Sequence, residues 1–305
     1  MNIAFNINRL AMIGLGVTLN SLLKNCSNPK KINIYILCAD LNYKDKENIH
    51  KLLFKYGLIN IELIDFNVKE HFGFFSSLQG DWTPYGRLLL QDYIVDDAVL
   101  YLDADLVVEL DVLLLDGFDF HGKAIAAVNG GQMRYALDHP FLCKEIGLDL
   151  DLAVFNSGIL LMNLKVWREK DIKSQCLTFG KKYSDQLTSH DQTILNALFA
   201  GNFAFLPSKF NISWYANTKR PVGRIGILHF VGSPKPWDLF GRYLHKGFSV
   251  WKSYLDVDWK KAYYKYNYSD FVRAWHIRKS YARSFILKKK QNKLSRDFIK
   301  KSELP

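Results

Sequence analysis

Two carboxylates, Asp103 and Asp105, directly follow a run of apolar residues at 98–102. On an extended strand, residues i and i+2 point to the same side, so both side chains should meet where a buried strand emerges at a sheet edge. Ligands of open α/β sheets usually bind in that crevice. Two adjacent carboxylates repel each other unless a cation or a proton lies between them, and their oxygens suit a hard divalent metal. The pair therefore predicts a site for a metal and a diphosphate.

The Asp-x-Asp spacing is weak support by itself, because it occurs three times in the chain. The other two copies begin at Asp149 and Asp256, and neither follows a strand-like run. The simplest explanation of any one copy is a solvated turn. The interpretation as a site therefore depends on partners elsewhere in the sequence.

Two later segments carry polar residues that could line such a site. Asn156 precedes an apolar run, where a lone Asn is usually a turn residue. Asp191 and Gln192 open a predicted helix, where Ser189 and Gln192 would form a capping box and Asp191 would favour the helix dipole. The residues alone leave the functional and the structural explanation open for both segments.

A histidine and a lysine follow one another at the end of the last predicted strand. His229 would end the strand, and a loop with Gly232 and Lys235 follows. Histidine is a common metal ligand, Gly lets the backbone approach oxygens, and Lys supplies a point charge. A lone His on a strand is more often structural, so this segment also stays open.

The elements that must position these residues alternate between strand-like and helix-like patterns. This alternation predicts an α/β fold with a mostly parallel sheet and helices on both faces. A GxGxxG phosphate loop is not supported, because Gly14 and Gly16 fall inside the first predicted helix. The predicted strands are 3–7, 31–39, 59–66, 98–103, 123–128, 158–164 and 225–231, and the predicted helices are 12–24, 43–56, 83–94, 165–183 and 190–200.

Length and composition narrow the class of protein. The chain has 305 residues, 49% of them hydrophobic, which is enough for one large α/β domain or two small ones. We find no run of 18 apolar residues and no leader of the signal-peptide type, so we expect a cytoplasmic protein. The cysteines lie far apart without CxxC pairing, and we expect them to be reduced and buried; they are Cys26, Cys38, Cys143 and Cys176.

Four segments in order carry a family resemblance. The runs LYLDADL, FNSGILLMNLKVWR, HDQTILNALF and HFVGSPKPW resemble the retaining glycosyltransferases of family 8 over roughly residues 1–250. That family includes bacterial lipopolysaccharide galactosyl- and glucosyltransferases and glycogenin. The resemblance implies a GT-A fold, a Rossmann-like α/β domain that binds a nucleotide sugar and Mn²⁺. Two oxygens and one nitrogen suit Mn²⁺ better than Mg²⁺, which is the second choice.

The resemblance also implies roles for individual residues. Asp103, Asp105 and His229 would coordinate the metal. Asp191 and Gln192 would carry the catalytic roles, with Gln192 beneath the anomeric carbon. Because a neutral amide is a poor nucleophile, we expect front-face attack with retention rather than a covalent intermediate. The implied donor-binding residues are Asn8, Arg87, Asp103, Ala104, Asp105, Asn129, Asn156, Gly232 and Lys235.

Two positions depart from the family pattern. Family members commonly have an acidic residue at the end of the first strand, near the uracil ring, where this chain has Asn8. They also commonly have Asp after the strand at 123–128, where this chain has Asn129. An amide can still pair with a uracil edge, so UDP remains the expected nucleotide. The sugar is less defined, with galactose and glucose first and N-acetylhexosamine as an alternative.

The C-terminal region, residues 251–305, predicts a separate role. Residues 271–305 contain 11 Lys and Arg against two acids, while the rest of the chain is nearly neutral. Aromatic residues precede and interleave with these charges, which suits a helix at an anionic membrane surface. The alternatives are a helix docked on the catalytic body and, less favoured, RNA binding; we expect no nucleic-acid partner for the body.

The combined hypothesis is a metal-dependent enzyme at the inner face of a bacterial membrane. It would transfer a hexose from a UDP-sugar to a surface-glycan acceptor such as lipopolysaccharide core. One alternative is a non-catalytic protein of the same fold that binds nucleotide sugars or glycans. A second alternative is a nucleotidyltransferase, which would consume NTP.

Overall fold

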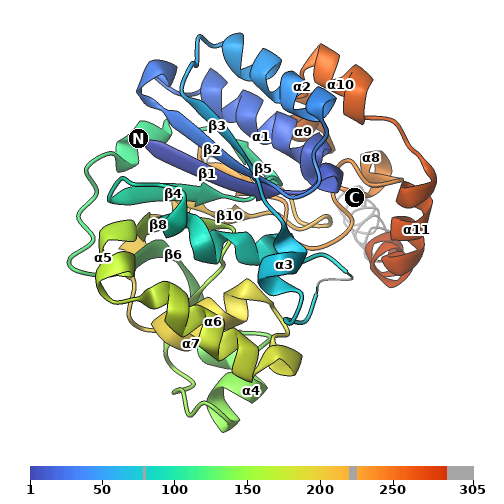
Figure 1. The fold of residues 1–305 in the computed structure, drawn as a ribbon. Helices are drawn as coiled ribbons and strands as arrows, with labels where there is room; N and C mark the ends of the chain where they lie inside the picture. The colour runs from blue at the N-terminus through green and yellow to red at the C-terminus, as the bar shows by residue number, and fades with distance from the viewer. Residues whose placement is uncertain (78–79, 220–224, 287–305) are drawn as a thin grey trace, which may run out of the picture.

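A central sheet organises the computed structural model, which describes residues 1–77, 80–219 and 225–286 (Figure 1). Within these residues the sheet has eight strands, in the order β3-β2-β1-β4-β8-β6-β7, with β9 paired to β6. The strands are β1 (Asn2–Ile7), β2 (Asn33–Cys38), β3 (Ile61–Asp65), β4 (Ala98–Leu102), β6 (Ile125–Gln132), β7 (Ala153–Phe155), β8 (Ile159–Asn163) and β9 (Ala204–Leu206).

The sheet is mostly parallel, as the alternation of patterns predicted. β1 pairs in parallel with β2 and with β4, and β2 pairs in parallel with β3. β8 lies antiparallel between β4 and β6, a direction that the sequence pattern did not reveal. Every residue of β1 is buried, as expected for a strand covered on both faces.

Helices cover both faces of the sheet (Figure 1). Helices α1 (Met12–Lys24) and α2 (Tyr43–Phe54) lie on one face, and α5 (Leu164–Glu169), α6 (Ile172–Lys182) and α7 (Asp191–Phe199) lie on the other. One apolar cluster joins the first face to α1 and α2, and a second joins the opposite face to α5–α7. The α/β class and the two-sided covering are therefore confirmed.

Two predicted helices differ in detail. Residues 83–94 were expected to form an α-helix, but Thr83–Asp92 is a 3-10 helix whose Gly86 backbone lies directly against the Asn6 side chain. The expected helix at 165–183 is broken into α5 and α6, because Asp171 adopts a left-handed conformation with φ of 48°. Apolar periodicity continues across that break, so the pattern did not reveal it.

A second, smaller sheet lies beside the first and completes the site. β5 (Leu106–Val108) pairs antiparallel with β11 (Ile227–His229), which pairs in parallel with β10 (Ile212–Ser213). β5 begins just after the Asp-x-Asp turn, and His229 is paired with Leu106. This pairing brings the late His to the early carboxylates.

The aromatic segment after residue 250 packs partly on the body. Trp251 in α9 (Phe248–Ser253) and Trp259 in α10 (Val257–Tyr263) are buried. Trp259 fills the space above Gly16 and donates its indole N–H to the Met12 carbonyl oxygen at 2.8 Å. These two rings therefore face the protein interior, whereas α11 (Tyr268–His276) keeps several aromatic side chains exposed.

The expectation for the cysteines is met in part, and the tail is described only up to residue 286. No helix among the described residues is long and apolar enough to cross a membrane. The basic residues from Lys288 onward lie outside the described residues. Cys143 is part-exposed, and the other three cysteines are buried; all four are free thiols.

Candidate active site

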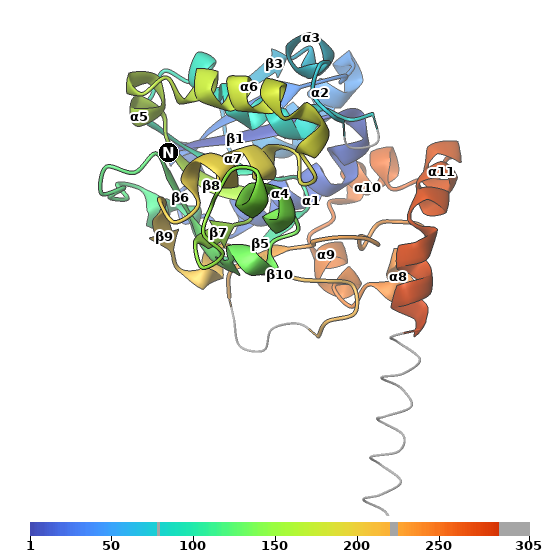
Figure 2. The ribbon, with the colours of Figure 1, turned by 90° about the horizontal axis from the view of Figure 1, so that it is seen from below.

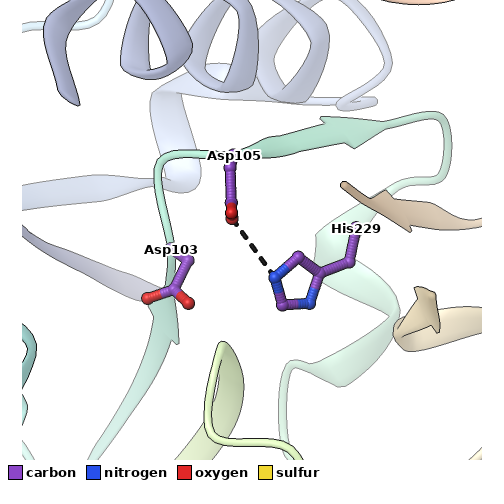
Figure 3. Close-up of side chains that lie close together, drawn as sticks. All are labelled: Asp103, Asp105 and His229. Atoms are coloured by element: carbon purple, nitrogen blue, oxygen red, sulfur yellow. Dashed lines mark ion pairs between the residues drawn. The ribbon is translucent and has the colours of Figure 1, made fainter. Parts of the chain in front are cut away.

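Asp103, Asp105 and His229 converge on one point at the carboxyl end of β4 (Figure 3). One ligand atom from each of the three lies within 4.8 Å of the others. Asp103 and Asp105 flank the turn between β4 and β5, and His229 ends β11, which pairs with β5. The structure thus places together the three residues expected to hold a metal.

His229 is oriented by a neighbour that the sequence did not suggest. Its Nδ1 lies 3.1 Å from the Asn211 side-chain oxygen, and the side chain is buried. An amide oxygen only accepts, so Nδ1 carries the proton and donates, which leaves Nε2 with its lone pair. That Nε2 faces Asp105 Oδ1 at 3.2 Å (Figure 3). The histidine is therefore oriented so that its Nε2 could bind a metal.

The site also has the space and the free oxygen that a cation needs. Among the described residues, buried Asp105 Oδ1 accepts no hydrogen bond, and it faces His229 Nε2 at 3.2 Å. Gly158 borders the same space, because a Cβ there would lie 2.5 Å from His229 Cε1 and 2.6 Å from Asp103 Oδ2. An orphaned carboxylate oxygen beside two more ligands fits a divalent metal.

Lys235 reaches the site from the loop after β11. Its Nζ lies 2.5 Å from Asp105 Oδ2 and also donates to the Phe230 carbonyl oxygen. Burial raises the pKa of Asp105, but the neighbouring Lys235 ammonium opposes burial, and the pKa is held well below its usual range. Asp105 is therefore a carboxylate, and an ammonium group lies within reach of any phosphate bound there.

Arg87 is a buried link between two acids. Its Nη2 donates to Asp103 Oδ1 at 2.9 Å, and its Nε lies 3.2 Å from Asp191 Oδ2. Burial lowers the pKa of Arg87, but the charges of Asp103 and Asp191 outweigh burial and raise it. Burial raises the pKa of Asp191, and Arg87 opposes that rise. Arg87 therefore fixes the two carboxylates relative to each other.

Gln192 and Asn156 contact each other, and Asn156 also contacts Asn211, the partner of His229. Gln192 Oε1 accepts from Asn156 Nδ2 at 2.9 Å and from the Ser157 backbone N–H at 3.2 Å. The expected structural alternative, a capping box with Ser189, does not form. The N-cap of α7 is His190, which makes no side-chain cap and has a φ of 56°. That unusual backbone turns Asp191 and Gln192 toward the site.

The other predicted donor-binding residues lie around this group, and their side chains contact other parts of the described chain or solvent. Asn8 directly follows β1 and donates its amide N–H to Asp81 Oδ2 at 2.8 Å, while its side-chain oxygen accepts from the Ala11 N–H. Asn129 is exposed on β6, and Gly232 opens the loop of Lys235 with φ of 72°. The Ala104 carbonyl oxygen lies against Gly14 of α1.

Two residues that the sequence did not single out belong to the site. The Tyr101 hydroxyl donates to Asp103 Oδ1 at 2.9 Å, and its ring lies 4.1 Å from the Arg87 guanidinium carbon. The period-2 alternation of a strand places residues 101 and 103 on one side and could have indicated it. No local pattern marks Asn211, because it reaches His229 only through the small sheet.

The fold and this donor set define a class: α/β transferases that hold a diphosphate ester with a metal and a lysine. The sequence profile described as "Glycosyl transferase family 8" matches residues 2–240. The chain belongs to this family of retaining GT-A glycosyltransferases.

Two curated relatives and one solved structure illustrate the similarity. A lipopolysaccharide 1,3-galactosyltransferase of Salmonella typhimurium is 28% identical over 79% of this chain and 74% of its own length. A lipopolysaccharide 1,2-glucosyltransferase of Escherichia coli is 26% identical over 88% of this chain and 84% of its own. The galactosyltransferase LgtC, solved with donor and acceptor sugar analogs, superposes with a TM-score of 0.71 at 27% identity, covering 86% of this chain and 99% of LgtC.

Proposed function

We propose that the protein transfers a hexose, galactose or glucose, from a UDP-sugar to a surface-glycan acceptor such as lipopolysaccharide core, with retention of configuration. The observation that carries the proposal is the joint placement of Asp103, Asp105 and His229 with Lys235. The names of the similar lipopolysaccharide hexosyltransferases support the choice of sugar and acceptor.

Mn²⁺ is the metal we propose for Asp103, Asp105 and His229. Two carboxylate oxygens and one imidazole nitrogen suit Mn²⁺ better than Mg²⁺, which prefers oxygen alone. When bound, the metal would stabilise negative charge on the departing diphosphate. His229 Nε2 and Asp105 Oδ1, which face each other at 3.2 Å, support this assignment because a cation between them would bind both lone pairs.

Lys235 would offset the charge on the leaving group, because its Nζ already lies at the carboxylate pair. Gln192 would line the anomeric carbon as a neutral amide, held by Asn156 and Ser157. A held amide oxygen is a poor nucleophile, so the leaving phosphate oxygen would take the acceptor's proton on the same face. Asp191, whose carboxylate Arg87 holds at 3.2 Å, would accept from a sugar hydroxyl.

UDP release from a panel of UDP-sugars, measured with Mn²⁺ and with EDTA, tests the activity. We expect Mn²⁺-dependent release from UDP-galactose or UDP-glucose, lowered about a hundredfold to a thousandfold in Asp105→Asn. Asp149→Asn is the matched control, since it alters another Asp-x-Asp pair at an exposed site and should leave the rate unchanged.

Three results would contradict the proposal. Full release in EDTA removes the metal from the mechanism. Tight UDP binding without turnover on any acceptor favours a non-catalytic binding protein. Consumption of NTP in place of UDP-sugar favours a nucleotidyltransferase.

We further propose that the protein works at the inner face of the cell membrane, attached through residues 271–305. On α11, Tyr268, Phe271 and Trp275 are 83%, 58% and 66% exposed, and their i, i+3, i+7 spacing puts them on one face. Basic residues follow at Arg278 and Lys279. Aromatic rings beside Lys and Arg suit the interface of an anionic membrane.

Flotation with anionic liposomes tests the attachment. We expect the wild-type protein to float and the double variant Phe271→Ser, Trp275→Ser to float less. The control pair Tyr135→Ser and Leu137→Ser removes apolar residues that are 81% and 72% exposed elsewhere on the body. Equal flotation of all three proteins would refute attachment through α11.

A further inference from the structure

The loop that carries Lys235 is closed by a buried carboxylate. Asp238 Oδ2 accepts from the Lys235 backbone N–H at 2.7 Å, and the Asp238 N–H donates to the Lys235 carbonyl oxygen at 3.2 Å. Asp238 is 4% exposed. The turn that aims Lys235 at Asp105 is therefore fixed by the position of Asp238.

A residue of α11 holds that carboxylate from outside the catalytic body. Arg273 donates through Nε to Asp238 Oδ1 at 2.7 Å and through Nη2 to Asp238 Oδ2 at 3.2 Å. Burial lowers the pKa of Arg273, but the hydrogen bond and charge of Asp238 outweigh burial and raise it. A two-pronged contact of this kind fixes both distance and orientation.

Two further contacts join the helical residues that follow α11, up to residue 286, to the chain around this loop. The rings of Phe240 and Tyr281 meet edge to face with centroids 6.1 Å apart. Asn217 donates to the Ser284 hydroxyl at 3.3 Å, and Ser284 is 3% exposed. Figure 2 shows α11 beside α8 (Gly241–Leu244), which directly follows the loop. On its other side the loop packs Trp237 against Gly14 of α1.

We propose that Arg273 is a positioning residue for the transfer reaction: through Asp238 it holds the loop that presents Lys235 to the diphosphate. The inference rests on the proposed function, because it gives Lys235 a leaving group to stabilise. It also links the exposed aromatic face of α11 to the active site, since Phe271 and Trp275 lie on the same helix as Arg273. A small displacement of a positioned charge can lower a rate about a hundredfold.

The test compares Arg273→Met with Arg273→Lys and with a matched control. Lys55→Met removes a different ion pair of the C-terminal region, Lys55 with Asp256 at 2.8 Å, which does not touch the loop. The measurements are UDP binding in Mn²⁺ by calorimetry, donor and acceptor KM with kcat, and hydrogen exchange of the peptide covering 231–241.

For Arg273→Met we expect weaker UDP binding, a kcat/KM for the donor lowered roughly tenfold to a hundredfold, and faster exchange in 231–241. The KM for the acceptor should stay unchanged. Arg273→Lys should fall between, because an ammonium keeps the charge but not the planar fork. Lys55→Met should match the wild type in all these measurements.

The outcomes separate this inference from the proposed function. Wild-type protein that binds no UDP in Mn²⁺ refutes the proposed function, while the exchange comparison still tests the link between Arg273 and the loop. Wild-type binding together with unchanged binding and exchange in Arg273→Met overturns the inference. Should Arg273→Met not fold, Arg273→Lys carries the same comparison, and unchanged exchange and donor KM there overturn it.

Discussion

At the scale of single residues, the site depends on a close approach that only glycine permits. Gly158 lies where any Cβ would meet His229 and Asp103 at 2.5 and 2.6 Å. Real Cβ atoms do not come that close, so a side chain at position 158 must displace His229 or Asp103.

We therefore predict that Gly158→Ala weakens Mn²⁺ binding about tenfold or more, the scale at which disturbed ligand orientation acts. Calorimetric titration with Mn²⁺ measures the affinity, and thermal unfolding in EDTA separates this effect from misfolding. Wild-type affinity in a folded Gly158→Ala protein would contradict the geometry.

Asn8 departs from the acidic residue expected at the end of the first strand, and the structure gives a reason. Its amide nitrogen donates to Asp81 Oδ2 at 2.8 Å. A carboxylate at position 8 would place two negative charges in contact. The amide of Asn8 avoids this repulsion, and Asp81 supplies the only carboxylate of the pair.

Exchanging the amide and the carboxylate between positions 8 and 81 tests this explanation directly. We predict that Asn8→Asp lowers the free energy of unfolding by roughly 1–2 kcal/mol, because the hydrogen bond is replaced by repulsion. Adding Asp81→Asn should restore most of the loss by reversing the pair. Urea denaturation of the four proteins measures the coupling, and strictly additive effects would refute it.

At the scale of elements, α10 belongs to the catalytic body and α11 presents its aromatic residues to the outside. Trp259 is 3% exposed above Gly16, whereas Trp275 is 66% exposed. A tryptophan on α10 therefore stabilises the fold by burial, whereas a tryptophan on α11 is left in contact with solvent.

We predict that Trp259→Ala lowers the free energy of unfolding by about 3–5 kcal/mol, the usual cost of emptying a buried aromatic site. Trp275→Ala should change it by less than about 0.5 kcal/mol, as exposed positions do. Chemical denaturation monitored by circular dichroism compares the two, and equal effects would show that α10 is not docked as described.

At the scale of the whole molecule, one buried histidine makes stability depend on pH. Burial, with the charge of Lys235 acting in the same direction, lowers the pKa of His245 to about 3. The folded state keeps His245 neutral, while the unfolded chain takes up a proton near the ordinary value of 6.5. A lowered pKa of this kind contributes stability above pH 6.5 that is lost as the pH falls toward 3.

We predict that His245 lowers the free energy of unfolding of the wild-type protein by about 2 kcal/mol between pH 7 and pH 5, because one proton is taken up on unfolding. His245→Asn should show a flatter profile over that range, because an amide oxygen can still accept from the Gly247 N–H. Thermal unfolding at both pH values measures the slope. An unchanged slope in His245→Asn would assign the pH dependence to other groups.

The sequence by itself determined the α/β class, the strands that bear the site, and the family. Strand and helix patterns are local, and the carboxylate pair at Asp103 and Asp105 is read directly from the end of a buried run. Four segments in order then selected His229 and Lys235 as partners. The direction of β8 and β11 was not predicted, because apolar runs look alike in parallel and antiparallel strands.

Only the tertiary structure decided how these residues act on one another. Lys235 reaches Asp105 across 130 positions of sequence, and Arg273 reaches Asp238 across 35. Such contacts depend on the pairing of β5 with β11 and on the docking of α11, which no local spacing encodes. For the same reason Arg87 proved to be a buried link between two acids. The sequence selects which groups are present, and the packing of distant elements fixes their distances, charges and freedom to move.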